Sequence, residues 1–111
     1  MLLQSFEKTL NCKLNVAAFG SGRGSNFQAI LTAMQRGQIP GARIALVVSN
    51  NSGAGILEIA RMNSLPAVHL SQKQFPDETA FVDALLDLLR SHGVDFIVLA
   101  GYMKLLHPRV I

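Results

Sequence analysis

The chain has 111 residues, of which 50% are hydrophobic and 15% are charged, and its formal net charge is +3. This length suits one domain with a buried core, and the scattered Lys and Arg residues form no basic block that would favour a nucleic-acid partner. No apolar run reaches the ~20 residues of a membrane-spanning helix, so we expect no membrane partner. The single cysteine, Cys12, excludes an internal disulfide and a thiolate metal cluster and fits a cytoplasmic protein.

The apolar pattern changes repeatedly along the chain between runs typical of buried strands and the spacing of amphipathic helices. We interpret residues 1–13 as an N-terminal extension. The elements predicted after it are a strand over 14–19, a helix over 26–35, a strand over 43–48, a helix over 55–63, a strand over 67–70, a helix over 77–91 and a strand over 96–100. The last strand is nearly all apolar, as a parallel strand covered on both faces would be. This alternation predicts an α/β fold, a Rossmann-like, mainly parallel sheet with flanking helices.

The most informative segment is 20–26, Gly-Ser-Gly-Arg-Gly-Ser-Asn, which joins the first predicted strand to the first predicted helix. Its three glycines allow a sharp turn and leave backbone amides uncovered, and Ser25 and Asn26 add a hydroxyl and a carboxamide at the helix start. The first amides of a helix have no intrahelical partner and lie at the positive end of its dipole. The segment therefore predicts a site for a phosphate or carboxylate.

Two familiar phosphate loops do not match this segment. The dinucleotide pattern G-x-G-x-x-G requires glycine where Ser25 or Phe27 stands, and the nucleoside triphosphate loop requires lysine where Ser25 follows Gly24. A simpler alternative stays open at this point. In it the glycines only close a tight turn, and Ser25 or Asn26 only caps the helix.

The segments 21–30 and 98–106 together resemble the glycinamide ribonucleotide formyltransferases of purine biosynthesis. The resemblance implies transfer of a formyl group from 10-formyltetrahydrofolate, a cosubstrate, to the amine of phosphoribosylglycinamide. The positions matching the family's phosphate loop are Gly24, Ser25, Asn26, Phe27 and Gln28. Those matching its folate pocket are Met103, Lys104, Leu105 and Leu106. The implied partners are these small molecules, with a homo-oligomer left open.

The family's catalytic Asn-Ile-His-Pro-Ser segment is not matched. His107-Pro108 is no substitute, because Leu105 stands where the Asn would be and Arg109 stands where the Ser would be. We therefore expect no catalytic residue within this chain and interpret 14–111 as the N-terminal, phosphate-binding part of a formyltransferase domain, apparently truncated. The alternative is a non-catalytic α/β module that binds a phosphate-bearing ligand.

The histidines and the segment around Glu78 give two smaller expectations. The dispersed histidines His69, His92 and His107 have no partner spacing that indicates a metal, so no metal site is assigned. The resemblance also implies that Glu78 stands where the family often has an arginine for the glutamate tail of folate, with Lys73 as a nearby cation.

Overall fold

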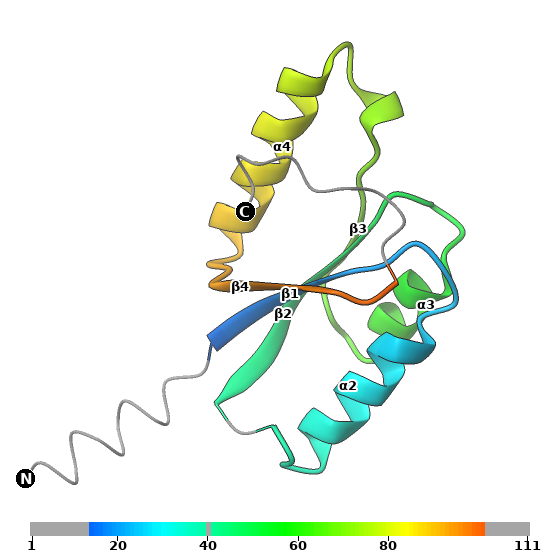
Figure 1. The fold of residues 1–111 in the computed structure, drawn as a ribbon, viewed down its shortest axis with the longest axis vertical. Helices are drawn as coiled ribbons and strands as arrows, with labels where there is room; N and C mark the ends of the chain where they lie inside the picture. Colours follow the sequence, from blue (N-terminus) through cyan, green and yellow to red (C-terminus); the bar gives the residue numbers. More distant parts are fainter. Residues whose placement is uncertain (1–13, 40, 102–111) are drawn as a thin grey trace, which may run out of the picture.

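The structure is a computed structural model that describes residues 14–39 and 41–101 (Figure 1). Within them, β1 (Leu14–Phe19), β2 (Ala42–Ser49), β3 (Ala67–His69) and β4 (Phe96–Leu99) form one parallel sheet in the order β3-β2-β1-β4. The α/β fold with a parallel sheet is confirmed. The predicted extension over 1–13 lies outside the described residues.

The helices between the strands are α2 (Ser25–Gln35), α3 (Gly55–Met62) and α4 (Glu78–Ser91). The strands and helices lie within about one residue of most predicted bounds. The exception is a short 3₁₀ helix, η1 (Gln72–Gln74), which has too few residues for any apolar period to mark it. Its start is closed by a capping box, in which the Ser71 hydroxyl accepts the N–H of Lys73 and Oε1 of Gln74 accepts the N–H of Ser71.

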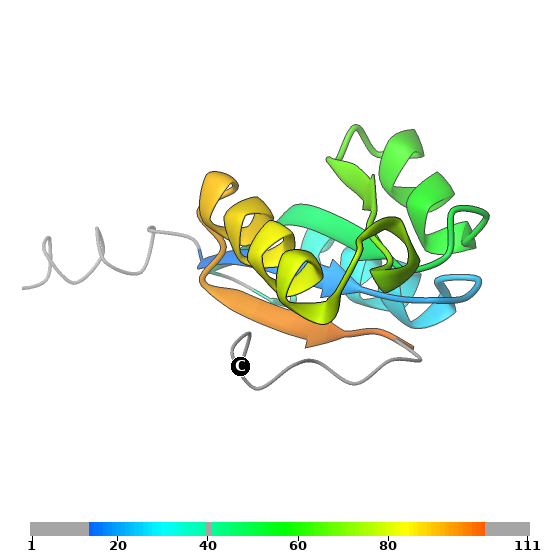
Figure 2. The same cartoon turned by 90° about the horizontal axis from the view of Figure 1, so that it is seen from above.

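Helices cover both faces of the sheet, α2 and α3 on one and α4 on the other (Figures 1 and 2). Alternate residues of β1 follow this division: Val16 and Ala18 pack with the α2 and α3 side, and Ala17 and Phe19 pack with the α4 side. Because both faces of β1 and β2 are covered, nearly every residue at their carboxyl halves is buried.

The last strand differs from its prediction. β4 pairs with β1 and lies at one edge of the sheet in the part of the chain that the structure describes. Phe96 is 58% exposed and Leu99 is 53% exposed, so the expectation of a strand covered on both faces is wrong for these residues. An apolar run indicates a strand, but it does not tell which neighbours the strand has.

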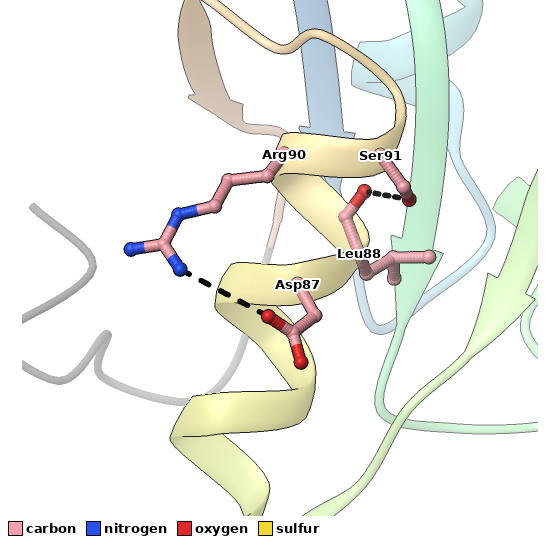
Figure 3. A network of polar contacts seen from close by, with 4 residues as sticks. All are labelled: Asp87, Leu88, Arg90 and Ser91. Carbon is pink, nitrogen blue, oxygen red and sulfur yellow. Dashed lines mark hydrogen bonds and ion pairs between the residues drawn. The ribbon is translucent and has the colours of Figure 1, made fainter.

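The ends of α4 show why this helix starts and stops where it does. The carboxylate of Asp77 accepts the backbone N–H of Ala80 at 2.8 Å, which caps the first turn. In the last turn the Ser91 hydroxyl donates to the carbonyl of Leu88 at 2.9 Å, and Arg90 lies 3.9 Å from Asp87 (Figure 3). His92 follows as the C-cap, its Nδ1 2.9 Å from the Leu88 carbonyl, a position that favours a partly positive group.

The amino ends of the strands are held by Asn15. Its Oδ1 accepts from Nε of Arg43 on β2 at 2.6 Å, and its Nδ2 donates to the carbonyl of Gly93 before β4 at 2.9 Å. Its backbone N–H also donates to Asp95 at 2.9 Å. The Asn15 side chain thus links β1 to β2 and to the segment before β4 at the amino ends of the strands, opposite to the glycine-rich segment.

Candidate functional site

The glycine loop, residues 20–24, leaves the carboxyl end of β1 at the point where the strand order reverses. The chain passes from β1 outward to β2 and β3 and then returns to β4 on the other side of β1. In open parallel sheets ligands bind at such a reversal, beyond the carboxyl ends of the strands. The fold therefore places the loop where the sequence predicted an anion site.

Backbone hydrogen bonds tie the loop to both neighbouring strands. The N–H of Gly20 donates to the carbonyl of Val48 at the end of β2, and the N–H of Ser21 donates to the carbonyl of Gly101 beyond β4, each at 3.1 Å. The carbonyl of Gly22 accepts the N–H of Ile56 in the first turn of α3 at 3.3 Å. The loop is therefore anchored from three directions.

Two of the loop's glycines are required by close packing. A methyl group on Gly20 would lie 2.6 Å from Cδ1 of Ile56 and 2.9 Å from the carbonyl oxygen of Ala100, both shorter than carbon atoms tolerate. Gly24 is buried and has a φ of +85°, a left-handed conformation that favours glycine. Gly22 meets nothing within 4 Å and faces open space.

The N-terminus of α2 begins immediately after the loop, with Gly24 as its N-cap and no side chain capping it. The N–H of Gln28 donates to the carbonyl of Gly24 at 2.7 Å, which closes the first turn. The N–H groups of Ser25, Asn26 and Phe27 precede that bond and have no hydrogen-bond partner among the described residues. Helix capping by Ser25 or Asn26, the simpler alternative, is not what the structure shows.

The predicted phosphate residues differ in how far their side chains are exposed. Ser25 and Asn26 are exposed, so their side chains are accessible together with their amides. The ring of Phe27 is fully buried in the core beneath α2, which leaves only its backbone N–H for a ligand. Gln28 is exposed, and its carboxamide donates to the hydroxyl of Thr32 at 3.1 Å.

The other expectations concern residues away from this corner. Met103, Lys104, Leu105 and Leu106, the predicted folate residues, and His107 lie outside the described residues. His69 ends β3, where its Nδ1 lies 3.4 Å from Nε2 of Gln74. Within residues 14–39 and 41–101, no three His, Cys, Asp or Glu side chains gather as metal ligands would.

The structure adds one contact that the sequence analysis did not predict. The hydroxyl of Ser21 donates to Oδ1 of Asn50 at 2.6 Å and joins the glycine loop to the loop after β2. The available signal was topological, because both residues follow parallel strands and such strand ends share one edge of the sheet.

The formyl transferase family matches residues 14–111. The chain belongs to the formyl transferase family.

Several named relatives are similar over most of the chain. Phosphoribosylglycinamide formyltransferase of Haemophilus influenzae is 43% identical over 94 residues, which are 85% of this chain and 44% of that protein. The Bacillus subtilis protein of the same name is 38% identical over 90 residues, 81% of this chain and 46% of that protein. The chain thus spans about half the length of these relatives.

Solved structures of similarly named proteins share the fold of this chain. Glycinamide ribonucleotide transformylase 1 of Geobacillus kaustophilus superposes with a TM-score of 0.83 at 42% identity, covering 88% of this chain and 52% of that one. A formyltetrahydrofolate deformylase of Pseudomonas putida superposes with a TM-score of 0.78 at 23% identity, which shows a shared fold alone. No helix in the described part of the chain combines the length and apolar character needed to cross a membrane.

Proposed function

We propose that residues 14–111 form the phosphate-binding part of a phosphoribosylglycinamide formyltransferase. The observation that carries this proposal is the uncapped start of α2, where the amides of Ser25, Asn26 and Phe27 lie beyond the end of β1. Hydrogen-bond donors at the positive end of a helix dipole suit a phosphate monoester. The names of the relatives supply the substrate, phosphoribosylglycinamide.

The amides of this corner would hold the phosphate while the rest of the substrate extends along the carboxyl edge of the sheet. The side chains of Ser25 and Asn26 would add a hydroxyl and a carboxamide donor to the same group. No acidic residue lies in the first turn of α2, so nothing on that turn repels an anion. Binding energy gathered at the phosphate orients the distant reacting amine, as remote groups of a substrate commonly do.

The reaction proposed is transfer of a formyl group from 10-formyltetrahydrofolate to that amine. The amine nitrogen attacks the formyl carbon, the bond from that carbon to the folate nitrogen breaks, and a proton moves from the amine to the folate. A carboxamide and an imidazole would stabilise the oxyanion and move the proton. No Asn and His stand two residues apart between residues 1 and 111, so we assign those roles to none of them.

The proposal extends to the folate pocket and to the location of the protein in the cell. By the resemblance, Met103, Lys104, Leu105 and Leu106 would line the folate pocket, and no metal takes part. A cytoplasmic location is also proposed, since one cysteine offers no internal disulfide for an oxidising compartment to form.

Calorimetric titration tests the proposal. The chain should bind phosphoribosylglycinamide and ribose 5-phosphate, and it should bind the dephosphorylated ribosylglycinamide much more weakly. Equal affinity for the phosphorylated and dephosphorylated compounds would contradict a phosphate site at the start of α2. Binding of many unrelated phosphate esters with equal affinity would favour the non-catalytic phosphate-ligand module instead.

A further inference from the structure

The side chain of Asn50 occupies a connecting position at the carboxyl edge of the sheet. Asn50 follows Ser49, the last residue of β2, and is half-buried. Its Oδ1 accepts the hydroxyl of Ser21 at 2.6 Å, a short hydrogen bond between groups that are partly shielded from water. This contact joins the glycine loop to the loop after β2.

The loop that carries Asn50 is itself held in place. The fully buried Ser49 accepts the N–H of Asn51 on its hydroxyl at 3.1 Å and the N–H of Leu70 on its carbonyl at 2.9 Å. The carbonyl of Asn51 accepts the N–H of Ala54 at 3.1 Å, so backbone groups hold the turn that follows Asn50. Asn50 therefore projects from a backbone that has little freedom to move.

The glycine loop needs such a support. Glycine visits more backbone conformations than any other residue, so a segment with three of them loses much entropy when it adopts one conformation. The carbonyl of Gly22 is held by the N–H of Ile56, but a methyl group on Gly22 would meet nothing within 4 Å, so no packing on that side restrains it. The Ser21 hydroxyl bond to Asn50 restrains the residue just before Gly22, three residues ahead of the N-cap Gly24.

We propose that Asn50 is a positioning residue for anion binding. It acts through Ser21, holding the glycine loop in the conformation that leaves the first amides of α2 open. Asn50 need not touch the phosphate. The inference rests on the proposed function, because it assigns a role to the phosphate site described there.

The test uses Asn50→Ala, Ser21→Ala and the double variant, with Asn51→Ala as the matched control. Asn51 carries the same side chain one residue further along, but its oxygen bonds within its own turn. Ribose 5-phosphate is titrated into each protein well below its unfolding temperature. Loss of one hydrogen bond should weaken binding by about threefold to tenfold for Asn50→Ala. The Asn51→Ala variant should keep the original affinity within about twofold.

The double variant separates a shared bond from two independent effects. If Asn50 acts through Ser21, the double variant binds no more weakly than Ser21→Ala, because both substitutions remove the same bond. If the losses of affinity multiply, Asn50 acts by another route and the inference is overturned. A residue that only stabilised the fold would lower the unfolding temperature and leave the affinity of the folded protein unchanged.

Failure of the inference differs from failure of the proposed function. If the unsubstituted chain binds no ribose 5-phosphate, the proposed function falls, and amide hydrogen exchange of residues 22–26 without ligand decides the role of Asn50. Exchange should be faster in Asn50→Ala than in Asn51→Ala, and equal rates would overturn the inference. If Asn50→Ala does not fold, Ser21→Ala removes the same bond and serves in both measurements.

Discussion

Gly24 packs directly against the backbone of Ile56, and a methyl group on Gly24 would lie 2.9 Å from the Cα of Ile56. The N-cap of α2 and the first turn of α3 therefore touch backbone to backbone. This contact holds the start of α2 against the first turn of α3. It explains why glycine is needed at a position where Ser, Thr, Asp or Asn usually caps a helix.

Gly24→Ala should destabilise the chain and weaken anion binding. The methyl group meets the backbone of α3, and an alanine at a φ of +85° is strained, so we expect a loss of about 1–3 kcal/mol in the free energy of unfolding. Urea unfolding measures it. Gly22→Ala is the control, since Gly22 faces open space. Equal losses for both variants would show that the contact with Ile56 is not the cause.

Asn26→Ala should weaken phosphate binding without destabilising the chain. Asn26 is exposed and caps nothing, so its loss leaves the fold unchanged. A hydrogen bond to a charged group contributes about 1.5–3 kcal/mol, and titration with ribose 5-phosphate should show a corresponding loss. Gln28→Ala should lose less, because that carboxamide already bonds to Thr32. A larger loss for Gln28→Ala would show that the Gln28 side chain, and not that of Asn26, is the main contact of the ligand.

Phe27→Ala should lower stability strongly and leave the affinity of the protein that stays folded close to the original. Its ring is fully buried against the sheet, and removing a buried phenyl group costs about 3–5 kcal/mol. Thermal unfolding followed by circular dichroism measures the effect. A stable Phe27→Ala protein with impaired binding would contradict a contribution from the Phe27 amide alone.

Asn15→Ala should destabilise the chain and spare anion binding. It removes side-chain hydrogen bonds to Arg43 and Gly93 at the amino ends of the strands, far along the sheet from the glycine loop. We expect a loss of about 1–2 kcal/mol in urea unfolding. Arg90→Ala is the comparison: its pair with Asp87 is 75% and 80% exposed, so its loss should cost less than about 0.5 kcal/mol.

The chain of 111 residues should show no formyl transfer above background, although it should bind the phosphorylated substrate. The expectation follows from the absence of an Asn and His two residues apart in this sequence. Removing catalytic groups commonly lowers a rate by several powers of ten, so a spectrophotometric assay with both substrates distinguishes the outcomes clearly. If protein of confirmed mass transfers formyl groups rapidly, the expectation is wrong and His107 becomes a candidate catalytic group.

Much of this fold is determined locally. The apolar runs at 14–19 and 43–48 and the helical spacing at 77–91 predict elements that the structure confirms, because strand and helix periods depend on residues close together in the chain. The glycine loop and the start of α2 are likewise local, since glycine conformations and the open amides of a helix start arise within a few residues. The carboxyl ends of parallel strands then predict where such a corner lies.

Only the tertiary structure decided which distant residues meet there. The order β3-β2-β1-β4 places β4 at an edge and leaves Phe96 exposed, although its sequence is that of a buried strand. The packing of Gly24 on Ile56 and the bond from Ser21 to Asn50 join residues about thirty positions apart. Such contacts depend on how whole elements stack on the sheet, and no periodicity within one segment carries that information.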